Sequence, residues 1–125
     1  MSPHDLLRIA LVWAGVSLVL YPVTWVLFLA CMSLKRADDA GTLKGAARSM
    51  GKVVLATGFV SDFLLNWWFL SVVTLHVAPE WLVTQHLERL MGKPNWQGRY
   101  ARYLCSTWLN PFDPSGRHCN PPQLT

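Results

Sequence analysis

The stretch "VSDFLLNWWFLSVV", residues 60–73, decides the fold of this chain. It is apolar and rich in tryptophan, yet it contains Asp62 and Asn66 one helical turn apart. Between residues 53–78, Asp62 is the only acidic or basic side chain among Asp, Glu, Lys and Arg, and residues 9–34 contain none. As helices, both runs exceed the ~30 Å hydrocarbon thickness of a bilayer. The pattern therefore predicts two membrane-spanning helices.

The composition supports the same class of protein. Of the 125 residues, 52% are hydrophobic and only 14% are charged, against about 25% charged residues in a typical soluble domain. A soluble bundle with buried helices is the alternative, but too few polar residues remain to cover two helices that are apolar on all sides. We therefore predict an all-α membrane protein in which residues 1–8 form a short N-terminal tail. Pro22 is expected to kink the first span.

The predicted linker, residues 35–52, carries the densest group of basic residues. Such residues usually lie on anionic lipid headgroups, and a partner-binding role is the alternative. Near the ends of the spans, the linker has more lysine and arginine than the opposite side, which favours a cytoplasmic linker with both termini across the membrane. The basic residues assigned to the membrane surface are Lys35, Arg36, Lys44, Arg48 and Lys52.

The predicted tail, residues 79–125, mixes polar, aromatic and proline residues and has no long apolar run. One or two short amphipathic helices are predicted, over residues 79–91 and 96–109, and both segments combine aromatic with basic side chains. Helices of this kind placed directly after a span are typical of the membrane interface. The alternative is a small subdomain that packs on itself. The proline-rich residues 110–122 are expected to be irregular.

The cysteines leave two states of the tail open. Cys105 and Cys119 lie fourteen positions apart. A periplasmic tail would join them in a disulfide that contributes about 3 kcal/mol, whereas a cytoplasmic tail would keep them as thiols. A metal site could combine them with His118 and either His86 or His76, but the spacing matches no known ligand pattern. We predict no metal and no other cofactor.

The polar residues of the second span form a narrow stripe. Gly58, Asp62 and Asn66 are spaced four residues apart, so a helix presents them on one side. A charged aspartate near the bilayer centre costs about 2.5–3.5 kcal/mol, and small or polar stripes usually face other helices. The stripe predicts a helix–helix contact within the chain, in a homo-oligomer or with a host membrane protein. Lining a lumen or sensing protons is the alternative.

The sequence contains no arrangement of residues that indicates catalysis. It has no glycine-rich phosphate loop, and no Ser or Cys nucleophile with a suitably spaced histidine. We therefore predict that the protein is not an enzyme and identify no small-molecule substrate. The net charge of +4 flanks apolar runs, which fits binding to the lipid bilayer better than to nucleic acid.

Three stretches support a resemblance to a known group. With the Asp62 and Asn66 pair, the segments "LKRADDAGTL" (34–43), "PEWLVTQHLERL" (79–90) and "NPFDPSGRHC" (110–119) resemble small membrane proteins of tailed bacteriophages and prophages. The resemblance implies a setting, the bacterial inner membrane, and no settled activity. The segment "HVAPEW" (76–81), which joins the second span to the tail, is less acidic than the corresponding segment in that group.

Three functions follow as hypotheses. The first is an interaction protein that modifies a host or phage component, for example in superinfection exclusion. The second is a holin, a pore-forming lysis protein, although holins usually end in a short basic tail and this tail is long and contains cysteine. The third, ranked last, is an enzyme or metal carrier built on Cys105, His118 and Cys119.

Overall fold

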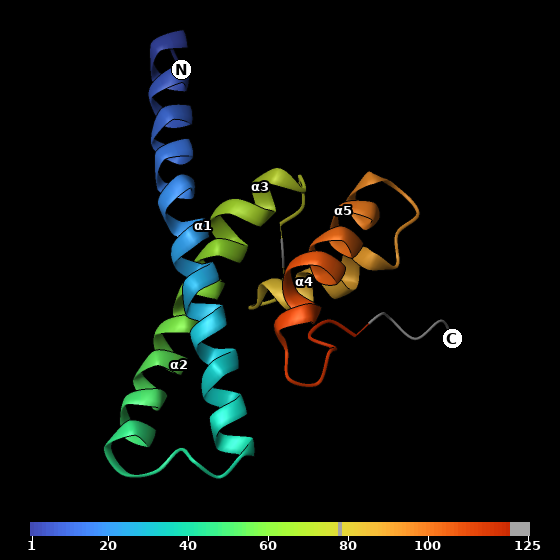
Figure 1. Ribbon diagram of the computed structural model, residues 1–125. Coiled ribbons are helices and arrows are strands. Elements are labelled where there is room, and N and C mark those ends of the chain that lie inside the picture. Colours follow the sequence, from blue (N-terminus) through green and yellow to red (C-terminus); the bar gives the residue numbers. More distant parts are fainter. Residues whose placement is uncertain (78, 121–125) are drawn as a thin grey trace.

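The computed structural model describes residues 1–77 and 79–120, and within them every regular element is helical. An antiparallel pair of long helices, here called the hairpin, is followed by a compact tail (Figure 1). The hairpin consists of α1 (Pro3–Asp39), α2 (Gly45–Leu65), the π-helical turn η1 (Asn66–Leu70) and α3 (Ser71–Val73). The tail consists of α4 (Val83–Met91), α5 (Trp96–Leu104), the π-helical turn η2 (Cys105–Leu109) and the 3-10 turn η3 (Asn110–Phe112).

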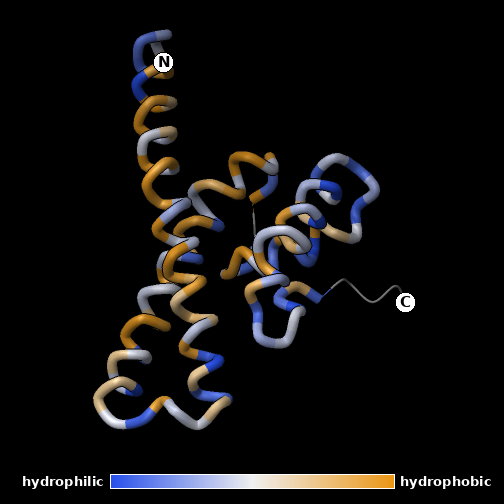
Figure 2. Tube along the Cα trace, in the orientation of Figure 1, coloured by the Kyte–Doolittle hydropathy of each residue, from blue (hydrophilic) through white to orange (hydrophobic). Residues whose placement is uncertain are grey.

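The two long helices have the length and polarity predicted for membrane spans. An 18-residue stretch of α1 has a mean hydropathy of 2.0, and one in the continuous helix from α2 to α3 has 1.5. Both are long and apolar enough to cross a membrane, and Figure 2 shows the apolar colour along most of α1 and along α2 to α3. The prediction of an all-helical chain with two such helices is confirmed.

The helix boundaries differ from the predicted ones. Helix α1 already begins at Pro3, because Ser2 and Asp5 form a capping box in which each side chain bonds the other's backbone N–H. The predicted tail at residues 1–8 is therefore mostly helical. Helix α2 begins at Gly45, inside the predicted linker, where alanines favour the helix. Residue 78, which ends the second predicted span, and residues 121–125 lie outside the described residues.

Helices α1 and α2 meet through small and polar side chains. The Thr24 and Ser61 hydroxyl oxygens lie 2.6 Å apart, and both residues are buried. Towards the end of the hairpin opposite the linker, the Trp13 indole N–H donates to the Trp68 carbonyl over 2.9 Å. Pro22 lies within α1, which continues past it as one helix. Large side chains also take part in this contact, since the Trp13 and Phe69 rings stack with their centroids 5.8 Å apart.

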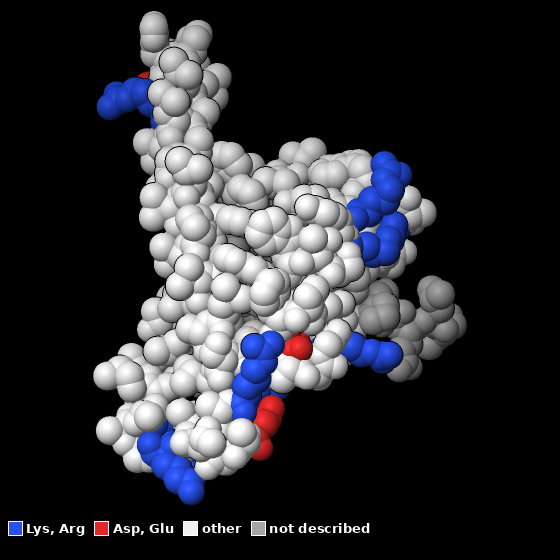
Figure 3. Space-filling model, viewed as in Figure 1, with Lys and Arg blue, Asp and Glu red and all other residues white. Residues whose placement is uncertain are grey.

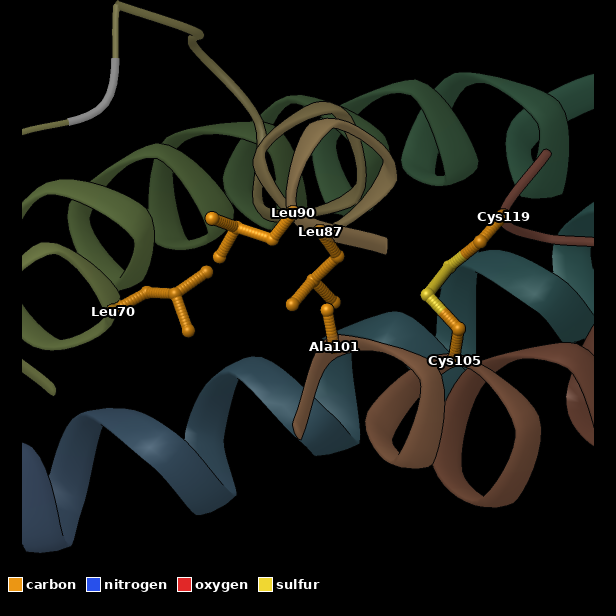
Figure 4. Close-up of a cluster of buried hydrophobic side chains, with 6 residues drawn as sticks. All are labelled: Leu70, Leu87, Leu90, Ala101, Cys105 and Cys119. Atoms are coloured by element: carbon orange, nitrogen blue, oxygen red, sulfur yellow. A yellow bond between two sulfur atoms is a disulfide. The ribbon is translucent and has the colours of Figure 1, made fainter. Parts of the chain in front are cut away.

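The hydrophobic core belongs to the tail. Among the described residues, the main buried cluster contains Leu87 and Leu90 of α4, which have no exposed surface, together with Ala101, Cys105 and Cys119 of the tail and Leu70 of the hairpin (Figure 4). Helix α5 lies so close to the end of α4 that a Cβ on Gly98 would be 1.9 Å from the Lys93 carbonyl oxygen. Glycine is therefore required for this close packing.

The tail packs along the side of the hairpin. Near α3, the Gln97 amide donates to the Thr74 carbonyl over 2.6 Å. Near the linker, the Lys35 ammonium lies 3.3 Å from Asp113 Oδ1, and Arg36 donates to the Phe112 carbonyl over 2.8 Å. The tail thus reaches both ends of the hairpin. The hairpin supplies the polar groups that the tail bonds at both places.

Candidate functional site: the junction between hairpin and tail

The predicted stripe divides between two contacts. Gly58 faces α1, where a Cβ would lie 2.9 Å from the Cys31 sulfur, so glycine permits the close approach of the two long helices. Asp62 and Asn66 face the tail of the same chain. The structure therefore brings Gly58 to a helix–helix contact, as the stripe suggested, and directs the two polar residues to α4 and to the segment before it.

Asp62 bonds the first residue of α4. Its Oδ2 accepts the Val83 backbone N–H over 3.0 Å. This N–H is one of the donors that a helix N-terminus leaves without an intrahelical partner, and the positive end of the helix dipole favours a carboxylate there. The bond therefore provides Asp62 with a polar contact inside the chain.

Asn66 is the centre of a buried network. Asn66 is only 1% exposed, and its amide nitrogen donates to the Glu80 carbonyl over 2.8 Å. Its amide oxygen lies 2.8 Å from His86 Nδ1. Because an amide oxygen can only accept, His86 carries its proton on Nδ1. The asparagine thus ties the hairpin both to the segment before α4 and to α4 itself.

The other nitrogen of His86 explains its charge state. Nε2 is buried and has no hydrogen-bond partner among the described residues. Burial lowers the pKa of His86 to about 4, and the positive charge of Arg89 adds to this effect. The imidazole is therefore neutral near pH 7. Arg89 itself forms an ion pair with Glu80, which helps to fix the chain just before α4.

A second group of contacts closes the other end of the junction. Cys105 and Cys119 form a disulfide, with their Cα atoms 5.9 Å apart. The adjacent His118 ring packs edge-on against Phe28 of α1, with ring centroids 4.8 Å apart. His118 Nδ1 also lies 3.0 Å from the buried Asp113. The disulfide thereby keeps the end of the tail on the surface of α1.

Asp113 organises the turn after η3. Burial alone would raise the pKa of Asp113. The hydrogen bonds from Ser115, His118 and Lys35 nevertheless hold this pKa well below its usual range. The carboxylate is therefore charged near pH 7 and available to Lys35. A cavity of about 70 Å³ remains between the hairpin and the tail, and apolar side chains with Asp62 and His118 line it.

The basic residues of the predicted linker have different surroundings. Lys35 and Arg36 bond the tail, as described above. Lys44, Arg48 and Lys52 lie at the start of α2, are exposed, and form no ion pair within the part of the chain that the structure describes. In residues 1–77 and 79–120, no three potential metal ligands come together.

Sequence reasoning did not assign His86 or Glu80 to this junction. It considered His86 only as an alternative metal ligand. One signal was present, since His86 precedes Leu90 by four residues and thus shares the apolar face of α4. A buried histidine on such a face requires a polar partner, and Asn66 provides it. The arrangement is suited to holding segments together and contains no activated nucleophile.

Comparisons of this chain with known proteins identify no relative. No family model matches this chain, and no curated protein or solved structure shows significant similarity to it. The fold and the junction together describe an all-helical chain in which two potential membrane-spanning helices carry a disulfide-bonded tail.

Proposed function

We propose that the protein is an integral protein of a bacterial inner membrane that acts, without catalysis, by associating with another membrane protein or with itself. One observation carries this proposal. Large apolar side chains remain exposed on α1, α2 and η1, as at Leu18 (79%), Val19 (64%), Val60 (56%) and Trp67 (62%). Such a surface requires lipid or another helix around it.

The charges support the same interpretation. On the face shown in Figure 3, basic side chains gather near the ends of the hairpin and at the outer edge of the tail, and most of the α1 surface is uncharged. Charges beyond the ends of an apolar surface are typical of helices that cross a bilayer. The basic residues of the linker favour a cytoplasmic linker, whereas the Cys105–Cys119 disulfide, in a tail that contacts Lys35, favours an oxidising compartment at that end.

The resemblance to phage and prophage membrane proteins suggests the biological outcome. An inner-membrane protein of a resident phage that binds a host component or a component of an incoming phage would produce superinfection exclusion. A holin-like pore is less well supported. Asp62 and Asn66, which could line a water-filled pore, already bond the tail of their own chain.

Expression in a bacterium that challenge phages can infect tests the proposal. We expect the protein in carbonate-washed membranes, continued growth after induction, and reduced plating of at least one challenge phage. Abrupt lysis after induction would favour the holin alternative, and recovery in the carbonate supernatant would contradict membrane integration.

Crosslinking tests the mode of action. A photoreactive residue at Val19 or Val60, both exposed and apolar, should form adducts with a membrane protein or a second copy. The matched control is Gln85, which is exposed on the tail. Adducts only from Gln85 would move the association to the tail and contradict a lipid-facing interface.

A further inference from the structure

A groove lies between α1 and α2 at the linker end of the hairpin, outside the junction described above. Its volume is about 340 Å³. Its charged lining residues are Lys35, Arg48, Lys52 and Asp38, and its apolar lining residues include Leu43 and Leu55. The groove thus combines a mainly basic rim with an apolar wall.

The rim has an excess of positive charge that the chain does not neutralise. Its three basic residues and Asp38 give a net charge of +2, which Asp113 beside Lys35 reduces to +1. Arg48 and Lys52 form no ion pair within residues 1–77 and 79–120, whereas Lys35 is shared with Asp113. Arg48 and Lys52 are four residues apart and therefore lie on the same side of α2. The two side chains are free to bind an anion together.

The backbone at the start of α2 adds to this attraction. The helix has no side-chain cap at Lys44 and no acidic residue in its first turn. Its first N–H groups therefore lack a side-chain cap, and the positive end of the helix dipole lies within one turn of Arg48. A phosphate group is favoured at such a position.

We propose that this groove binds one anionic phospholipid, with the phosphate between Arg48 and Lys52 and an acyl chain against Leu43 and Leu55. The proposal rests on the proposed membrane location, which places the end of the hairpin at the level of lipid headgroups. Basic pockets between helices at this level suit phospholipid headgroups. The apolar wall distinguishes a lipid from free phosphate, because inorganic phosphate has nothing to place against leucine side chains.

Native mass spectrometry of the purified full chain tests this proposal. The protein is released from nanodiscs that contain phosphatidylglycerol in phosphatidylcholine, and the retained lipid is identified. We expect retention of one phosphatidylglycerol. Because each basic residue near a lipid surface contributes about fivefold in affinity, Arg48→Gln with Lys52→Gln should reduce retention by more than tenfold. The matched control, Arg99→Gln in the exposed part of α5, should retain the lipid.

Two further measurements keep the outcomes separate. Leu55→Gln should weaken retention of phosphatidylglycerol while leaving any binding of inorganic phosphate unchanged. Equal retention by the double variant and Arg99→Gln, or phosphate binding as tight as lipid binding, would overturn the lipid site. Either result could be obtained with protein that remains in carbonate-washed membranes. It would then contradict the lipid site alone, whereas loss of the protein from the washed membranes would contradict the proposed function.

Discussion

The hairpin and the tail bury their side chains in opposite ways. In the hairpin, the buried positions include Ser17, Thr24 and Ser61, while apolar side chains such as Leu18 face outward. In the tail, Leu87 is completely buried in a core closed by a disulfide. The tail therefore buries a cluster of apolar side chains, as a small domain in water does.

The difference shows what each part requires from its surroundings. The tail has a core of its own and needs only the hairpin surface to complete it through Leu70. The outward apolar side chains of the hairpin need a nonpolar environment, because in water they would remain hydrated. Two polar side chains of the second long helix, Asp62 and Asn66, serve instead as the points where the tail attaches.

The largest expected effect is a cavity in the tail core. Leu87→Ala should destabilise the tail by about 2–5 kcal/mol, because the buried leucine leaves a cavity that neighbouring residues fill only partly. Trypsin cleavage after the exposed Arg99 and Arg102, followed in detergent with increasing urea, measures the loss. Leu18→Ala is the matched control on α1. An equal effect of Leu18→Ala would mean that the two regions do not differ in packing.

Removal of the disulfide should have an effect of about 3 kcal/mol, given the loop that Cys105 and Cys119 close. Cys119→Ser should make the tail sensitive to trypsin and abolish the difference in gel mobility between reduced and unreduced protein. The hairpin should keep its helical circular dichroism signal. Cys31→Ser, in which the free cysteine of α1 is replaced, should change neither property. Identical mobility of the wild type with and without reductant would contradict the disulfide.

Acidification should loosen the tail through His86. The unfolded chain binds a proton at the ordinary pKa near 6.5, whereas the folded chain resists it down to about 4. Stability should therefore be independent of this group above pH 6.5 and should fall from pH 6.5 to pH 4, by a total of about 3 kcal/mol. Trypsin sensitivity of wild type and His86→Gln across this range isolates the effect, with His4→Gln as the control. Parallel pH profiles for wild type and His86→Gln would refute the assignment.

The smallest expected effect is at the attachment point. Asn66→Leu leaves the Glu80 carbonyl and His86 without their partner, which should cost about 1–3 kcal/mol. Detachment should appear as faster trypsin cleavage of the tail and as loss of a cysteine crosslink engineered between α2 and α4. Val72→Leu, at an exposed position of α3, is the control. Unchanged cleavage in Asn66→Leu would mean that the core alone holds the tail.

Topological labelling sharpens the comparison at the level of the whole molecule. Ser49 lies at the linker end of the hairpin and Val77 just beyond α3, and both are exposed. In a Cys31→Ser background, Ser49→Cys and Val77→Cys should react with a membrane-impermeant reagent from opposite sides. Reaction of both from one side would contradict a hairpin that crosses the membrane. Ser115 does not serve this purpose, because its partner Asp113 lies beside Lys35 at the linker end.

The sequence by itself determined the two long apolar helices and the residues that cannot face lipid. Helix length and transfer free energy depend on residues close together in the chain, so the uncharged run at residues 9–34 and the isolated Asp62 were informative without a structure. The same local reasoning located Gly58, Asp62 and Asn66 on one side of a helix and predicted amphipathic helices in the tail. It left the partner of the stripe open among this chain, a second copy and a host protein.

Only the tertiary structure decided that partner. The bonds from Asp62 to Val83 and from Asn66 to His86 join residues about twenty positions apart, and the pairing of Lys35 with Asp113 joins residues far more distant. Such contacts depend on the path of the whole chain, because many segments carry an N–H or an imidazole that could satisfy a buried carboxylate or amide. Their selection came from the close packing of α4 and α5 and from the disulfide, which no local pattern encodes.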